Sequence, residues 1–146
     1  MPDGAQKGPS FEEISETFEL MDDWMDRYRY VIELGQGLEG LDAADKTAET
    51  KVDGCASQVW LKAEPMRAPG EPVRLRFEGD SDAHIVRGLI AVLRALLSGR
   101  PASEIISCDA VGAFDALGFG EHLSSQRSNG LRAMIRRLKD EANALA

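Results

Sequence analysis

Residues 58–78 read QVWLKAEPMRAPGEPVRLRFE, and the two ends of this stretch alternate in the manner of β-strands. Apolar residues occupy every second position in both halves: Val59, Leu61 and Ala63, then Val73, Leu75 and Phe77. Because successive side chains of a strand point to opposite faces, the pattern predicts two strands with one buried face. Residues 64–72 are rich in Pro and Gly and predict the connection of a hairpin. A short strand at residues 50–53 would complete a sheet of about three strands.

Helical periodicity precedes this hairpin. Within residues 11–21 the apolar side chains recur at every third or fourth position, which predicts one face of a helix. A second helix is expected to begin at Asp22 or Asp23, either of which can cap it. We expect Gly35 and Gly37 to end this helix, because glycine is the usual residue at a helix C-terminus.

A third helix is expected directly after the hairpin. Asp80 or Ser81 would cap it, its apolar stripe would run over residues 85–96, and Gly99 would end it. The stripe is long enough to cover a small sheet.

Two short helices and one long helix complete the pattern. Pro101 suits the first turn of a helix, Asp109 can cap the next, and the last helix is expected to begin at Ser124 or Ser125. Four basic residues of this last helix are expected on its wetter side: Arg132, Arg136, Arg137 and Lys139. Helices, then strands, then helices are typical of an α+β protein rather than of alternating βαβ units. The sequence therefore predicts a small antiparallel sheet packed against helices.

Length and charge limit the classes of function. A chain of 146 residues suits one domain, which we expect over residues 11–146 after a flexible lead-in at residues 1–10. The net charge of −8 disfavours nucleic acid and anionic lipid as partners. No long apolar run and no signal-peptide pattern occurs, so we expect a cytoplasmic protein without a membrane segment.

Two cysteines and two histidines are the residues that suggest chemistry. Cys55, Cys108, His84 and His122 share no metal-binding spacing, so no metal site is predicted. Two free thiols are expected in a reducing compartment. Cys108 lies between two predicted helices and is interpreted as a packing residue. The small residues around Cys55 predict a loop tip, and the residues alone leave both a reactive thiol and a packing role open for it.

Four stretches resemble the signatures of the SufE family, in the same order along the chain. They are RYRYVIELGQGL (27–38), KVDGCASQVWL (51–61), FEGDSDAHIVRGLIAVL (77–93) and HLSSQRSNGLRAMI (122–135). The resemblance spans nearly the whole chain. It implies the α+β SufE fold, which is related to that of the U-type iron–sulfur scaffold proteins.

The resemblance also implies a function and its partners. Members of this family accept sulfur from the persulfide of a PLP-dependent cysteine desulfurase of the SufS or CsdA type, and stimulate that enzyme. Cys55 would be the catalytic persulfide carrier, and the sulfur would pass to a SufBCD-type scaffold complex for iron–sulfur cluster assembly. No cofactor of its own is implied, because PLP belongs to the desulfurase, and the protein would be an accessory sulfurtransferase rather than a stand-alone enzyme.

Six further residues match the family motifs and are candidates for shaping the loop or contacting the partner: Gly54, Ser57, Gln58, Asp80, Asp82 and Arg127. For the two aspartates, helix capping is the competing interpretation. For Arg127, the competing interpretation is a solvated first turn of the last helix.

Three other functions remain open. A regulator would stimulate the desulfurase without carrying sulfur on Cys55. A U-type scaffold would use three cysteines, whereas this chain has two. A thiol peroxidase or redox sensor would react with peroxide without any desulfurase.

Overall fold

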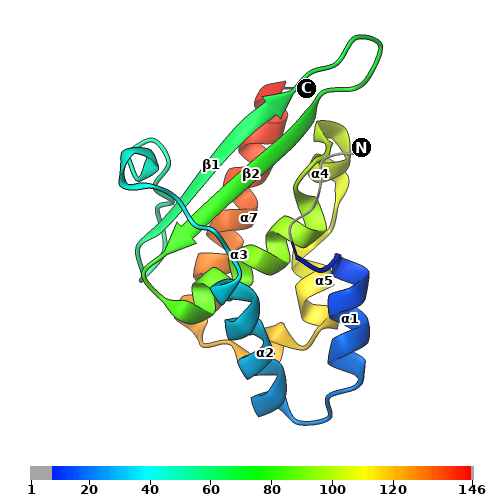
Figure 1. Ribbon diagram of the computed structural model, residues 1–146, viewed down its shortest axis with the longest axis vertical. Coiled ribbons are helices and arrows are strands. Elements are labelled where there is room, and N and C mark those ends of the chain that lie inside the picture. Colours follow the sequence, from blue (N-terminus) through cyan, green and yellow to red (C-terminus); the bar gives the residue numbers. More distant parts are fainter. Residues whose placement is uncertain (1–7, 146) are drawn as a thin grey trace.

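A computed structural model describes residues 8–145, so residues 1–7 of the predicted lead-in lie outside the described residues. The elements follow the predicted order of helices, strands and helices (Figure 1): α1 Phe11–Glu19, α2 Trp24–Gln36, a 3-10 turn Ala43–Asp45, β1 Val59–Met66, β2 Arg74–Ser81, α3 His84–Leu97, β3 Arg100–Pro101, α4 Ala102–Ser107, α5 Ala110–Ala116, α6 Phe119–His122 and α7 Ser125–Leu145. The prediction of an α+β fold with a small antiparallel sheet is confirmed.

The β1–β2 hairpin forms most of a three-stranded sheet, and α3 and α7 lie behind it (Figure 1). The register pairs Val59 with Ser81 and Met66 with Arg74, so the strands are matched along their whole length. The inward side chains Leu61 and Phe77 are each 1% exposed, as the alternation predicts. Helices α1 and α2 lie at the end of the molecule away from the hairpin loop.

The third strand differs from the prediction. Residues 50–53 contribute only an isolated bridge between Lys51 and Trp60, whereas β3 pairs with β2 through Arg74 and Leu75. Helix α3 brings the chain back to β2, and the pairing of β3 with β2 depends on this tertiary packing rather than on a local sequence pattern. Sequence alternation cannot detect a strand of two residues.

Helix α3 is the centre of the core. Ten of its 14 residues are buried, including Arg94, which forms an ion pair with Glu78 at 2.8 Å. Helix α2 crosses it closely: a Cβ on Gly35 would lie 2.6 Å from the backbone nitrogen of Gly88. Gly35 therefore lies inside α2, so the prediction that it ends the helix is wrong, whereas Gly37 caps the helix after Gln36, as predicted.

The capping predictions are correct at two helices and wrong at a third. Asp23 accepts a hydrogen bond from Met25 N–H at 3.0 Å and caps α2, and Asp109 caps α5 in the same way. Asp80 and Ser81 do not cap α3, because both belong to β2, where the pairing with β1 continues. The residue before α3 is Ala83, which has no capping side chain.

All four basic side chains of α7 were predicted to lie on its wetter side, but two of them bind backbone carbonyls of other segments. Arg137 donates to the carbonyl of Lys51 at 3.1 Å, and Lys139 donates to the carbonyl of Cys108 at 2.7 Å. Long basic side chains can cover the helix and still reach backbone acceptors with their charged ends. Arg132 and Arg136 are exposed, as expected.

Candidate functional site

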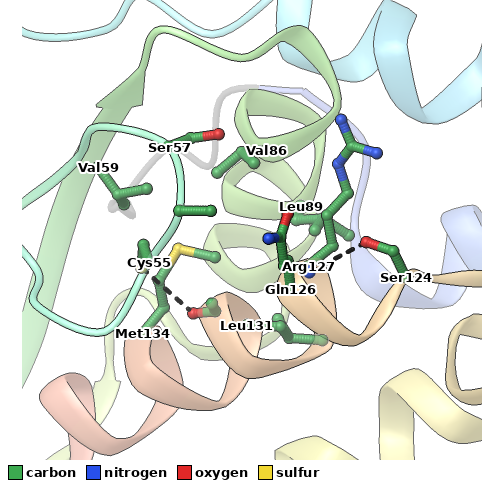
Figure 2. Close-up of a pocket in the computed structure, with 12 residues that line it drawn as sticks. Cys55, Ser57, Val59, Val86, Leu89, Ser124, Gln126, Arg127, Leu131 and Met134 are labelled. Atoms are coloured by element: carbon green, nitrogen blue, oxygen red, sulfur yellow. Dashed lines mark hydrogen bonds between the residues drawn. The ribbon is translucent and has the colours of Figure 1, made fainter.

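The loop that carries Cys55 lies against α7. Buried Val52 precedes the loop, and Gly54 turns the chain with a φ of +89°, a conformation that favours glycine. A side chain at Gly54 would meet Ala133 of α7 at 3.5 Å. The half-buried Cys55 thiol donates toward the carbonyl of Gly130, with the sulfur 3.8 Å from the oxygen (Figure 2).

A cavity of about 120 Å³ lies beside the thiol, between the loop, α3 and α7. Its lining mixes apolar and polar side chains (Figure 2): Val59, Val86, Leu89, Leu131 and Met134, with Ser57, Ser124, Gln126 and Arg127. A cavity needs roughly 10–15 Å³ to hold one water molecule. The space next to Cys55 therefore has room for another atom bonded to its sulfur.

Burial is the main influence on the ionisation of Cys55. Removal of the thiol from water raises the pKa of Cys55, and the nearby carboxylate of Asp53 raises it further. The thiol in this position is thus protonated at neutral pH and is a weak nucleophile. A partner that draws Cys55 out of the cavity would remove the larger of these two effects.

Both ends of the loop are fastened by side chains. At the end next to β1, Asp82 accepts a hydrogen bond from Gln58 N–H at 3.0 Å. Before the loop, Arg137 of α7 binds the carbonyls of Lys51, at 3.1 Å, and Glu49. The segment between these attachments is short and rich in small residues, so its movement would be confined to the part that carries Cys55.

Asp80 has a different environment and does not line the cavity. Its buried carboxylate accepts hydrogen bonds from Leu41 N–H at 3.0 Å and Ser81 N–H at 2.8 Å, and pairs with Lys46 at 3.3 Å and with Arg87. Burial alone would raise the pKa of Asp80, but these hydrogen bonds and the Arg87 charge outweigh it and lower that pKa. The residue fastens the segment before the Cys55 loop to β2 and α3.

Arg87 extends this attachment to α2. It donates to the carbonyl of Leu38 at 2.7 Å and to that of Gly35 at 3.3 Å. Gly40, with a φ of +76°, lets the chain approach the Asp80 carboxylate, because a Cβ there would lie 2.5 Å from a carboxylate oxygen.

The structure places the predicted site residues in three groups. Ser57 and Arg127 border the cavity beside Cys55, and Gly54 forms the adjacent turn. Gln58 and Asp82 meet at the end of the loop. Asp80 stands apart from both groups.

Gly130 and Arg137 belong to the site but had no role assigned from the sequence. Gly130 contacts Cys55 across 75 residues of chain, and Arg137 reaches Lys51 across 86. The glycine inside the periodic pattern of the last helix is the one signal that could have indicated a close contact there.

The other chemistry-bearing residues lie elsewhere. Cys108 ends α4 and is half-buried, and His84 is exposed at the start of α3. Within residues 8–145, no three His, Cys, Asp or Glu side chains are placed to hold a metal ion. No helix in the described part of the chain has the length and apolar character to cross a membrane.

Fold and site together define a small α+β protein in which the thiol of a loop cysteine, Cys55, faces a cavity. The chain belongs to the SufE family: residues 12–142 match the family model described as SufE, Fe-S metabolism associated domain. This membership associates the protein with iron–sulfur metabolism, and the resemblance seen in the sequence is confirmed.

Similar proteins agree with this assignment. An uncharacterized SufE-like protein of Rhizobium etli is 54% identical over 137 residues, covering 94% of this chain and 92% of that protein. One of Rhizobium meliloti is 54% identical over 133 residues, covering 91% of this chain and 94% of that protein. The solution structure of a hypothetical protein from Thermus thermophilus has a TM-score of 0.68 at 20% identity, with 92% and 94% of the two chains covered, and shares the fold.

Proposed function

We propose that this protein accepts sulfur from a PLP-dependent cysteine desulfurase of the SufS or CsdA type, holds it as a persulfide on Cys55, and delivers it to a SufBCD-type scaffold complex. The observation that carries the proposal is the position of Cys55, whose thiol faces a cavity of about 120 Å³ from a loop of small residues. Membership of the SufE family supports the link with iron–sulfur metabolism.

The chemistry requires one thiolate and no resident cofactor. The Cys55 thiolate attacks the outer sulfur of the donor persulfide; a new sulfur–sulfur bond forms as the old one breaks. The donor cysteine leaves as a thiolate, so sulfur moves without net oxidation, as in thiol–disulfide exchange. Cys108 lies at the end of α4 rather than in the cavity, so it is not placed to discharge the persulfide.

The cavity fits the storage part of this cycle. A persulfide is readily attacked by other thiols, and the side chains of Val86, Leu89 and Met134, which line the cavity, would help to keep such reagents away. The raised pKa of Cys55 at rest likewise keeps the empty carrier unreactive until a partner moves the loop. That same raised pKa argues against a thiol peroxidase or redox sensor, because those cysteines have lowered pKa values.

The test is peptide mass spectrometry after mixing the protein with a SufS-type desulfurase and free cysteine, without reductant. We expect the Cys55 peptide to gain the mass of one sulfur atom, the Cys108 peptide to gain none, and Cys55→Ser to lose the gain. Desulfurase turnover that rises equally with wild type and Cys55→Ser, without sulfur on Cys55, would instead establish an allosteric regulator.

A further inference from the structure

Gly130 lies inside α7, directly beside Cys55. A Cβ at this position would lie 3.6 Å from Sγ and 3.8 Å from Cβ of Cys55. Both distances are ordinary van der Waals contacts, and no other atom of residues 8–145 outside the neighbouring part of α7 lies within 4 Å of the position. The closed loop with its thiol therefore has room for an alanine at residue 130.

Close packing accounts for the other glycines inside helices. At each of them within residues 8–145, a Cβ would come closer than 3.0 Å to another residue, which would have to move: 2.6 Å at Gly35, 2.3 Å at Gly88, 2.2 Å at Gly112 and 2.5 Å at Gly120. The thiol form of Cys55 imposes no such constraint on Gly130. Because glycine inside a helix is less favourable than alanine, the lack of a side chain at residue 130 needs another explanation.

The thiol and a persulfide on Cys55 have different steric needs. The Cys55 thiol donates toward the carbonyl of Gly130, with the sulfur 3.8 Å from the oxygen (Figure 2). In a persulfide the outer sulfur takes the place of the thiol hydrogen at about 2 Å from Sγ, and in the same direction it would collide with this carbonyl. The Cβ–Sγ bond of a loaded Cys55 must therefore rotate and direct the outer sulfur elsewhere in the cavity.

Gly130 is part of the cavity wall that surrounds this rotation. It lines the cavity next to Leu131 and Met134 of α7, which are 6% and 1% exposed and are held by the close packing of the core. A methyl group on residue 130 would be attached directly to the helix backbone and could not turn aside. It would close the directions around Sγ that face α7.

We propose that the missing side chain of Gly130 provides the space for the outer sulfur of a Cys55 persulfide, so that the loop can close over its cargo. The presence of such a sulfur on Cys55 rests on the proposed function. Gly130 is a positioning residue and takes no part in the transfer of sulfur. Alanine at residue 130 fits beside the thiol but not beside the persulfide, so this substitution separates the two states of the carrier.

The test compares wild type with Gly130→Ala and with the control Gly37→Ala. Gly37 follows α2 with a φ of −78°, does not line the cavity, and a Cβ there would make an ordinary contact at 3.5 Å. Persulfides are made on the full chain without any desulfurase. The cysteines are first converted to mixed disulfides with an aromatic disulfide; hydrosulfide then attacks each cysteine sulfur, the aromatic thiolate leaves, and excess reagent is removed.

Glutathione is then added, and peptide mass spectrometry follows the loss of one sulfur atom from the Cys55 peptide, with the Cys108 peptide as the internal standard. The glutathione thiolate attacks the outer sulfur, and Cys55 leaves as a thiolate. Because overpacking of a filled site changes an equilibrium by about tenfold or more, we expect Gly130→Ala to lose this sulfur about ten times faster than wild type. Gly37→Ala should behave like wild type.

Two measurements on the unloaded protein show whether the effect belongs to the persulfide. Iodoacetamide labelling of the Cys55 thiol should be equal in all three proteins, because the thiol fits beside alanine. Gly130→Ala should unfold at a temperature no lower than that of wild type, because alanine favours the helix.

The outcomes that overturn the proposal are distinct. Equal loss of sulfur from wild type and Gly130→Ala rejects it. Labelling of the unloaded thiol that rises by the same factor as the loss of sulfur, or a lower unfolding temperature, shows that Gly130 holds the loop in both states and also rejects it. Loading by a SufS-type desulfurase is measured separately on wild type; failure there rejects the relay, whereas the result for the chemically made persulfide still decides the role of Gly130.

Discussion

Asp82 holds the end of the Cys55 loop, and its removal tests whether the closed loop protects the thiol. The Asp82 carboxylate accepts from Gln58 N–H at 3.0 Å, and the Asp82 N–H donates to the carbonyl of Gln58 at 3.3 Å. Asp82→Ala removes the first hydrogen bond and keeps the second. The substitution should therefore weaken closure of the loop without unfolding β1 or α3.

The size of the effect follows from the exposure of this carboxylate. A hydrogen bond to a buried charged group contributes about 1.5–3 kcal/mol, and for the exposed Asp82 we take about 1 kcal/mol. Because about 1.4 kcal/mol corresponds to a factor of ten, the open population should rise about fivefold. A reagent that reaches Cys55 only in the open loop should then react about five times faster.

The assay is the rate of iodoacetamide labelling of the Cys55 peptide, with the Cys108 peptide of the same molecule as the internal standard. Asp82→Asn keeps an acceptor for Gln58 N–H and should label like wild type, and Asp140→Ala removes an exposed charge on α7 with no effect on the loop. An unchanged ratio of Cys55 to Cys108 labelling in Asp82→Ala would refute the reasoning.

Two further predictions concern ionisation and stability. Because burial and then Asp53 raise the pKa of Cys55, its labelling should rise with pH at a midpoint above that of free cysteine, and Asp53→Asn should lower this midpoint. A labelling midpoint at or below that of free cysteine would contradict the raised pKa of Cys55. Because the thiol ionises at a lower pH in the unfolded chain than in the folded one, the free energy of unfolding should also fall as pH rises through the pKa of Cys55. Asp80→Ala leaves Arg87 without its buried partner and should lower the free energy of unfolding by about 3 kcal/mol in urea titrations near neutral pH. Since the pKa of Asp80 is lowered, wild type and variant should converge as pH falls through that pKa, and a difference that persists in acid would count against this account.

The parts of the fold that the sequence predicted are those with local periodicity. Strand alternation located β1 and β2, and the apolar stripe over residues 85–96 located α3, because both patterns reflect one buried face. Gly35 was misinterpreted because a glycine that ends a helix and a glycine that lets two helices touch look the same in one sequence. What distinguishes Gly35 is its close contact with Gly88 of α3, 53 residues further along the chain.

For the candidate site, the sequence predicted Cys55 and neighbouring motif residues such as Ser57 and Arg127, but not the contacts that hold the loop in place. Cys55 was identified from its motif and from the small residues around it. Its hydrogen-bond acceptor on Gly130, the cavity wall on α3 and α7, and the attachment by Arg137 depend on long-range packing that no local pattern encodes. Asp80 matched the motif, but its role in holding the preceding segment became apparent only through its contacts with Leu41 and Arg87.

The outer edge of β1 affects how the protein behaves at high concentration. β1 is an edge strand, and it includes Pro65, which has no amide hydrogen to donate. Beyond the bridge between Lys51 and Trp60, a strand from another molecule would meet this interruption and the charged side chains of Lys62 and Glu64. The projecting hairpin thus resists strand-to-strand aggregation, which an uninterrupted apolar edge would promote.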